Sequence, residues 1–283
     1  MTTVTTAPAH ADAPAADRQP RQLIVTVYGL YARQEHDWLS VAALVRLMAD
    51  LGIDGQAVRS SVYRLKKRGI LHSIPVSGAA GYALSSEAVA MLREGDVRIF
   101  RDHRASVADG WVLAVFSVPE RDRDKRHELR TRLTRLGFGT VAPGVWVAPR
   151  HVAAEAETLL ARHGLAGYVD LFRGEHLGFA DLGSKIRDWW DLAELAAHYG
   201  TFGDRFGPVA RRLARHAMTD REAFVAYVPI LTAWRQLPYR DPGLPLELLP
   251  HPWPGETAAS LFAELNAQLA EPARQYARSI IHG

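Results

Sequence analysis

The chain has 283 residues, of which 48% are hydrophobic and 23% are charged, values typical of globular proteins that exclude a wholly disordered or fibrous chain. Its formal net charge is +3 and its pI is about 9.2. Whether the chain can bind a polyanion therefore depends on where its positive charges lie. No apolar run reaches the roughly 18 residues of a membrane span, and the absence of cysteine excludes disulfides and thiolate nucleophiles. We therefore expect a cytoplasmic protein with two or three compact domains.

The N-terminal segment, residues 1–21, is rich in Ala, Thr and Pro and has no apolar core of the kind found in a signal peptide. It is therefore predicted to be a disordered tail. Ordered structure is expected from about Gln22 onward. Residues 23–31 contain β-branched side chains that suit a strand, but their apolar positions follow helical spacing, which favours a helix.

Residues 22–95 have the order of elements of a winged helix-turn-helix DNA-binding domain. Ser40 can cap a helix with apolar residues at helical intervals, Gly52 ends that helix, and Asp54 can cap a second helix a few residues later. Two helices joined by a short turn that contains glycine form the helix-turn-helix motif. Residues 71–84 then predict two short strands around a flexible tip, which is a β-hairpin.

The second of these helices carries the most informative charge pattern in the chain. Between Gly55 and His72 there are five basic residues and no acid, whereas an exposed helix face normally mixes both signs of charge. Val58, Val62 and Leu65 form an apolar stripe on one side of the helix. The remaining side is polar and basic.

Duplex DNA fits this pattern, because Gln and Arg can pair bidentately with bases and basic side chains bind phosphates. The candidate DNA-binding residues are Gln56, Arg59, Ser60 and Tyr63 for bases, and Arg64, Lys66 and Lys67 for phosphates. The competing interpretation is a solvated basic helix that binds nothing.

The central part of the chain, residues 110–182, is predicted to fold as a ferredoxin-like domain. Its strands and amphipathic helices follow the order βαββαβ, which defines that fold. Residues 96–109, just before it, are polar enough to be a linker. The fold class is therefore α+β with several domains.

Residues 183–283 are predicted to form a helical C-terminal domain. The helix after Thr219 is expected to begin with a capping box to Glu222 and to kink or break at Pro229. Aromatic and basic residues gather in this domain, and aromatic walls with cations suit an anionic organic ligand. The candidate effector-binding residues are Trp190, Tyr199, Arg205, Arg212, His216 and Trp234. An aromatic helical core with a basic exterior is the competing interpretation.

Two further patterns are weaker. A second basic cluster lies within residues 121–135, but acids interrupt it and permit intrahelical ion pairs, so a solvated helix face is favoured over a second nucleic-acid surface. The potential metal ligands His163, Asp170, Glu175, His176 and Asp181 have no fixed spacing. We therefore expect no metal site and no cofactor.

Three passages make the chain resemble the PaaX family of bacterial repressors, which control phenylacetic acid degradation. They are AVRSSVYRLKKRGIL at residues 57–71, the segment from DGWVLAVFSV to GVWVAPR at residues 109–150, and PYRDPGLPLELLPHPWPG at residues 238–255. The last is the most specific of the three. The resemblance covers most of residues 22–270 and implies a homodimer with a winged helix-turn-helix domain, a central domain shaped like the CRISPR-associated Cas2 protein and a helical C-terminal domain.

The resemblance also implies a function. Family members bind palindromic DNA operators, and the best-known ones are released by phenylacetyl-coenzyme A. By position, the recognition helix falls on Gly55 to Arg68 and the wing on Ile74 to Leu84, although the tip of this hairpin lacks the basic or aromatic residues of a DNA-touching wing. We therefore expect a ligand-responsive repressor, released by an acyl-CoA or an aromatic acid that binds between the central and C-terminal domains.

Two other functions stay open at this point. A Cas2-like domain suggests a metal-dependent nuclease, but that chemistry requires a carboxylate at the end of the first central strand, where Glu120 stands only beyond Pro119. We therefore expect that the protein is not an enzyme. The helix-turn-helix would alternatively bind another protein, and binding that does not change with salt would favour that interpretation.

Overall fold

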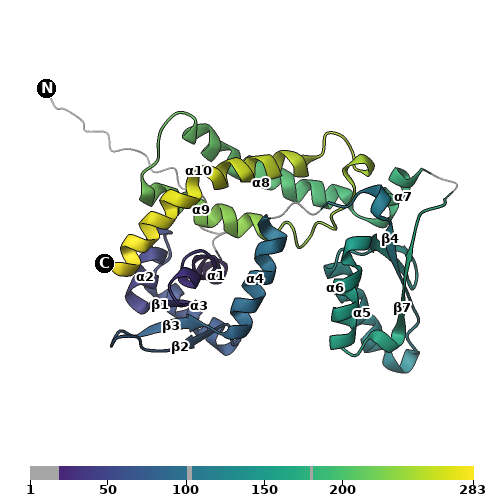
Figure 1. Ribbon diagram of the computed structural model, residues 1–283, viewed down its shortest axis with the longest axis horizontal. Coiled ribbons are helices and arrows are strands. Elements are labelled where there is room, and N and C mark those ends of the chain that lie inside the picture. The colour runs from purple at the N-terminus through teal and green to yellow at the C-terminus, as the bar shows by residue number, and fades with distance from the viewer. Residues whose placement is uncertain (1–18, 101–103, 179–180) are drawn as a thin grey trace. The chain divides into compact units, whose positions relative to one another are not determined.

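The computed structural model describes residues 19–100, 104–178 and 181–283 (Figure 1). These residues fall into two compact units, the first with residues up to Ala88 together with Ile280–Gly283, and the second with Val89–Ser279. Up to position 18, the predicted disordered tail lies outside the described residues. No helix in the described parts of the chain is both long and apolar enough to cross a lipid bilayer.

Three helices build the first unit: α1 (Pro20–Leu30), α2 (Val41–Asp50) and α3 (Gly55–Lys67). The helix predicted for residues 23–31 is confirmed, and Leu23, Ile24 and Val27 on its inner side are buried. It begins at Pro20, inside the stretch expected to be a tail. The reason is that proline is favoured in the first turn of a helix, where its missing N–H costs no hydrogen bond.

Both predicted caps are present in this unit. The Ser40 hydroxyl accepts a hydrogen bond from the backbone N–H of Ala43 at 3.1 Å. The Asp54 carboxylate accepts two, from the backbone N–H of Ala57 at 2.9 Å and of Gln56 at 2.8 Å, and these bonds hold the pKa of Asp54 below its ordinary value. Because each cap satisfies N–H groups that have no partner within the helix, the two residues fix where α2 and α3 begin.

An antiparallel sheet completes the first unit. It is ordered β1-β3-β2 and consists of β1 (Trp38–Ser40), β2 (Leu71–Ser73) and β3 (Gly81–Leu84). The strands predicted within residues 71–84 are confirmed, whereas the sequence pattern does not predict β1, since three residues are too few to show alternation. The Trp38 indole donates a hydrogen bond to the carbonyl of Ile74 at 2.9 Å and lies against Gly81, where any side chain would collide with the ring.

A helix occupies part of the stretch expected to be a linker. α4 (Ser86–Phe100) continues into residues 96–100. Its buried or half-buried residues include Ala88, Leu92, Gly95 and Ile99, and Val89, Asp96 and Arg98 next to them are also half-buried. Because the first four follow helical spacing, one inward-facing row sustains the helix although the stretch is polar overall.

The central part of the second unit has the βαββαβ order predicted for residues 110–182. Its elements are β4 (Trp111–Phe116), α5 (Arg123–Arg135), β5 (Gly139–Ala142), β6 (Val145–Pro149), α6 (Ala153–Arg162) and β7 (Val169–Gly174). The strands form an antiparallel sheet in the order β5-β6-β4-β7, and α5 and α6 cover one of its faces (Figure 1). This is the ferredoxin-like arrangement.

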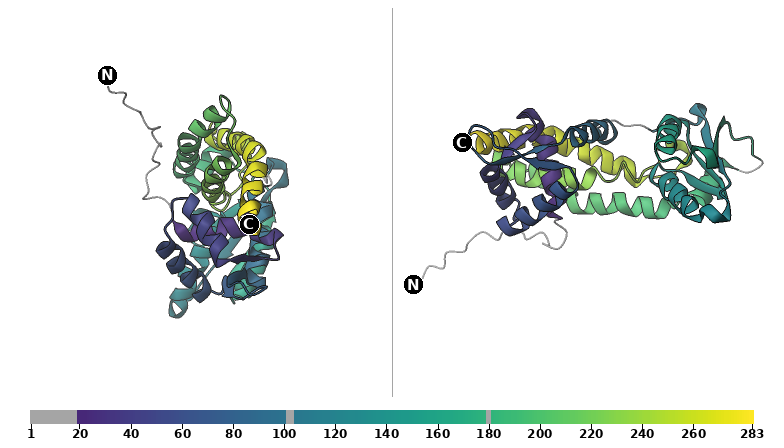
Figure 2. Two further views of the ribbon diagram at one scale, coloured as in Figure 1. Left: turned by 90° about the vertical axis from the view of Figure 1, so that its left-hand side faces the viewer. Right: turned by 90° about the horizontal axis from the view of Figure 1, so that it is seen from below.

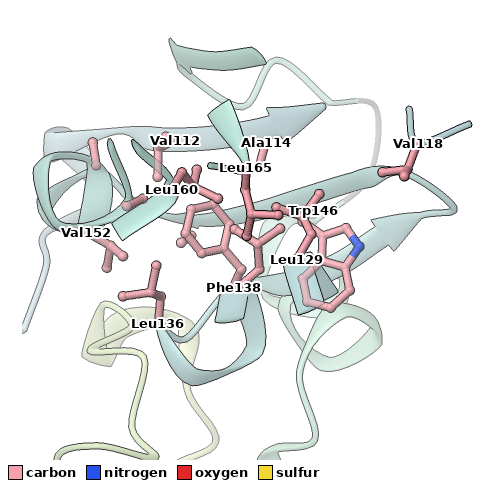
Figure 3. Packing of buried hydrophobic residues seen from close by; sticks show 14 residues of the cluster. Val112, Ala114, Val118, Leu129, Leu136, Phe138, Trp146, Val152, Leu160 and Leu165 are labelled. Carbon is pink, nitrogen blue, oxygen red and sulfur yellow. The ribbon is translucent and has the colours of Figure 1, made fainter. Parts of the chain in front are cut away.

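The sheet and its two helices enclose an apolar core (Figure 3). Val112 and Ala114 of β4 face this core together with Trp146 of β6, as the alternation of side chains along a strand requires. Leu129 and Leu133 of α5 are fully buried in it. The core therefore fixes which side of α5 faces solvent.

The remainder of the second unit is helical, as predicted. Its helices are α7 (Leu182–Trp189), α8 (Leu192–Leu213), α9 (Asp220–Trp234) and α10 (Pro254–His282), of which α8, α9 and α10 pack together (Figure 2). The predicted capping box is present, and the hydrogen bond from the Thr219 backbone lowers the pKa of Glu222. Pro229, expected to kink or break this helix, does not break it: α9 continues through the proline, and Val228 and Ile230 on both sides of it are buried.

Replacing Leu65 by alanine is expected to lower the free energy of unfolding of the first unit by about 2–5 kcal/mol, because its truncation leaves a buried cavity. Tyr63 lies on the outer side of the same helix and is 68% exposed, so Tyr63→Ala is expected to change that free energy by less than about 0.5 kcal/mol. Urea denaturation followed by circular dichroism measures both variants. Equal losses would contradict the orientation of α3.

Candidate nucleic-acid interface and ligand cavity

α3 exposes the side that the sequence predicts to bind DNA. Val58, Val62 and Leu65 are at most 3% exposed, on the side of α3 that contacts α1 and α2. The exposed residues on the other side include Gln56, Arg59, Ser60, Tyr63, Arg64, Lys66 and Lys67. Every predicted DNA-binding residue therefore lies on the solvent-facing surface of α3.

Local hydrogen bonds order part of this surface. Arg64 donates to the hydroxyl of Ser60 one turn earlier at 2.9 Å, and Lys66 donates to the hydroxyl of Ser73 on β2 at 2.6 Å. Lys66 is therefore directed toward the sheet. The side chains that make no hydrogen bond to another described residue are Gln56, Arg59, Tyr63 and Lys67. These four are available to a ligand.

The β2–β3 hairpin has a different chemical character. Its tip, residues 77–81, contains only serine, glycine and alanine, and Ile74 and Val76 beside the tip are 40% and 41% exposed. A hairpin tip without a cation cannot neutralise phosphates. α3 is therefore the element of this unit that suits a polyanion.

The acidic and histidine side chains of the central domain are the candidate metal ligands. Glu120, the carboxylate that follows β4, pairs with Arg126 at 3.2 Å. In residues 19–100, 104–178 and 181–283, His, Asp and Glu side chains form no group of three or more that could hold a metal ion.

The second unit contains a cavity of about 540 Å³. Its apolar wall is aromatic: the rings of Trp234 and Phe262 stack with their centroids 4.5 Å apart and 10° between their planes, and the ring of Phe100 lies 6.2 Å from that of Phe262. Tyr199 also lines the cavity, with its ring 6.5 Å from that of Trp234. A flat apolar group can pack against such an aromatic wall.

Polar side chains also line the cavity. Asp241 accepts hydrogen bonds from the Tyr199 hydroxyl at 2.6 Å and from Arg104 at 2.8 Å, so the two charges balance each other in the wall. The backbone at Gly255 passes close to Arg104 and to the indole nitrogen of Trp253. This nitrogen is buried and has no acceptor among the described residues. Trp253 itself is not among the residues that line this cavity.

Tyr199 and Trp234 are the two predicted effector residues that line this cavity. Trp190 lies elsewhere, because its indole N–H donates to the carbonyl of Gly137 at 2.9 Å and its ring packs 6.2 Å from that of Trp111. It therefore joins the central sheet to the helical part of the unit instead of facing the cavity.

The three basic residues predicted to bind the effector also lie outside the cavity. Arg205 lies over the ring of Phe206 at 5.1 Å, and Arg212 pairs with Glu222 at 3.1 Å. His216 is exposed beyond the end of α8. These residues were predicted to form one site because they are close in the sequence, but successive positions of a helix such as α8 point in different directions.

Most of the cavity is not predicted by the sequence. Phe100 belongs to the stretch expected to be a linker, and Phe262 has the pattern of any buried helical residue. Besides Tyr199 and Trp234, the local signal is the motif at residues 238–255, which contributes Asp241 and Gly243 to the wall. No local pattern joins segments that lie more than a hundred residues apart.

Three family models match the chain. They are described as PaaX-like protein for residues 19–88, PaaX protein central Cas2-like domain for residues 104–186, and PaaX-like protein C-terminal domain for residues 190–279. The transcriptional repressor PaaX of Escherichia coli (strain K12) is 30% identical over 258 residues, which cover 89% of this chain and 80% of that protein.

A solved structure is also similar. The uncharacterized protein Rv0674 from Mycobacterium tuberculosis matches with a TM-score of 0.62 and 22% identity, over 91% of this chain and 98% of that one. At this identity the likeness shows a shared fold. The family models cover the helices and sheet of the first unit, the ferredoxin-like domain and the helical part in turn, and the chain belongs to the PaaX family.

Proposed function

We propose that the protein is a transcriptional repressor that binds duplex DNA through α3 and responds to a small ligand. The exposed basic surface of α3, which contains no acid, carries this proposal. α3 follows α2 after a short turn and is followed by a β-hairpin, an order that supports a winged helix-turn-helix domain, whose second helix enters the major groove. The repressor function in the name of the Escherichia coli relative supports the same conclusion. We place the protein in the cytoplasm, together with its operator.

Residues in the first turns of α3 would read bases. Gln56 can pair bidentately with adenine and Arg59 with guanine, while Ser60 and Tyr63 can bond to a base edge or a phosphate. Lys67, at the other end of the helix, would bind a phosphate without regard to sequence. Affinity and specificity would thus come from different ends of α3.

Two protomers would place two copies of α3 in successive major grooves, about 34 Å apart. The outer face of the central sheet supports such a homodimer. Phe172 is 55% exposed and Val115 is 38% exposed on this face, and Leu113 pairs with Phe172 across β4 and β7. Exposed apolar side chains gathered on one face of a sheet are typical of a contact between proteins.

The cavity of the second unit is the proposed effector site. An aromatic acid, or the aromatic acyl group of a coenzyme A thioester, has a flat ring that would pack against the aromatic wall of Trp234 and Phe262 and oxygen atoms for the polar side chains that line the cavity. The volume of about 540 Å³ is that of a typical small-molecule site. Such a ligand releases DNA if it binds more tightly to a state of the protein that does not bind DNA.

Arg59→Ala is expected to cost roughly 1–3 kcal/mol of operator binding and to relax the base preference. Lys67→Ala is expected to weaken binding to all duplexes alike and to reduce the salt slope by about 1. Fluorescence anisotropy measures both effects, with a duplex from the upstream region of the gene and a scrambled duplex of equal length.

Arg162→Ala is the control, because it removes an exposed arginine from the last turn of α6; it is expected to bind as the wild type does. Identical losses for Arg59→Ala on both duplexes would argue against base reading. Affinity that does not vary with salt would instead favour a protein partner for α3.

Phe172→Glu is expected to convert the dimer into a monomer, because it places a charge in the proposed apolar contact. Sedimentation velocity measures the change, and an unaltered circular dichroism spectrum shows that the fold is kept. A dimer that persists in the variant would rule out this face as the contact.

A bound ligand at about 100-fold its Kd is expected to raise the melting temperature by roughly 5–10 °C. Phenylacetyl-coenzyme A, phenylacetate and coenzyme A are the compounds to test. Ala259→Phe fills the cavity that Ala259 lines and is expected to abolish the rise. Arg205→Ala, outside the cavity, is expected to show the same rise in melting temperature as the wild type. Loss of the rise in Arg205→Ala together with a normal rise in Ala259→Phe would instead place the effector site on the exposed side of α8.

A further inference from the structure

Two helices together carry a larger net positive charge than the whole chain. α3 and α5 each carry a formal excess of four positive charges, whereas the whole chain has a net charge of +3, so the rest of the chain has a formal charge of −5. The proposed contact with DNA accounts for the charge on α3. It gives no role to the charge on α5.

Ion pairs neutralise only part of α5. The pairs are Lys125–Glu128 at 3.1 Å, Arg132–Glu128 at 2.8 Å and Arg126–Glu120 at 3.2 Å. Arg123 and Arg130 are exposed and form no ion pair with any residue that the structure describes. Their charges are therefore available to a partner outside the chain.

The two arginines share one face of the helix. Arg123, His127, Arg130 and Thr134 follow one another at intervals of three and four residues, which places them on the same side. Leu133 is buried on another side of α5. Arg123 and Arg130 are about 10.5 Å apart along the helix axis, so they form a row of charge and not a single point.

Helix stability does not explain Arg123. It is the first residue of α5, where the helix dipole favours a negative side chain and disfavours a cation. Asp124, next to it, carries the negative charge that the N-terminal end of a helix favours. Arg135, in the last turn, carries the positive charge that the C-terminal end favours. Arg123 thus carries a charge whose benefit does not come from the helix itself.

We propose that this face of α5, the α5 basic stripe of Arg123, His127 and Arg130, binds the phosphates of duplex DNA. The proposal rests on the proposed function, since it requires that the chain binds DNA. Neither arginine lines the cavity described above or the separate one beside Trp190, so the stripe suits an extended polyanion better than a small phosphorylated ligand. Phosphate contacts carry no base information, and the stripe therefore adds equally to operator and random binding.

The double variant Arg123→Gln with Arg130→Gln tests this proposal in the full chain. Fluorescence anisotropy with the upstream and scrambled duplexes is measured at several salt concentrations. The plot of log affinity against log salt is expected to become less steep by about 1.8 for each protomer, at about 0.9 for each phosphate contact. Both duplexes are expected to weaken by the same factor, whereas Arg59→Ala lowers the ratio between them.

The matched control is Lys125→Gln with Arg132→Gln, which removes as many charges from the same helix, but from residues that pair with Glu128. It is expected to leave the slope near that of the wild type, and melting temperatures verify that both variants are folded. An unchanged slope in the stripe variant overturns the α5 contact and leaves the proposed function intact. Equal changes in the two double variants also overturn it, because they would reflect overall charge. A wild-type protein that binds neither duplex overturns both proposals.

Discussion

Val58, Val62 and Leu65 pack α3 into the first unit, and this packing determines which side of α3 meets solvent. Side chains on a helix keep fixed directions relative to one another, so burial of this stripe places Arg59 and Tyr63 outside. The cap at Asp54 adds a fixed starting point for the first turn. One helix thus encodes both part of the core and the charged surface. Packing defects in this stripe would disturb the alignment of the basic side chains as well as the stability of the fold.

Local patterns in the sequence predict those parts of the fold that depend on neighbouring residues. The caps at Ser40 and Asp54, the exposed side of α3 and the βαββαβ order all follow from periodicity or from hydrogen bonds over a few positions. The cavity is different, because Phe100 and Phe262 meet only when helices far apart in the chain pack together. Arg205 illustrates the converse: it is close in sequence to Tyr199, which lines the cavity, but does not line the cavity itself. Sequence proximity is a poor guide to a site built from several helices.

The motif at residues 238–255 has a structural explanation. Asp241 accepts hydrogen bonds from Arg104, Tyr199 and the backbone N–H of Gly243, so one buried carboxylate joins three segments of the second unit. Pro242 packs against Gly137, where a side chain would come within 3.0 Å of the proline ring. A buried carboxylate is costly unless its hydrogen bonds are complete. The motif therefore supplies a hydrogen-bonded carboxylate to one wall of the cavity. Its unusual sequence reflects the contacts that Asp241 and Pro242 make with other segments of the unit.

A response of DNA binding to a ligand requires a connection between the cavity and α3, which belong to different units. Two helices provide covalent routes. α4 starts in the first unit and contributes Phe100 to the cavity, while α10 contributes Phe262 and ends in the first unit, where His282 pairs with Glu35 at 3.2 Å. Coupling between two sites typically amounts to about 1–3 kcal/mol, comparable to the loss of one or two hydrogen bonds. A change of contacts worth this much free energy at the first-unit ends of these helices would therefore suffice for such a response.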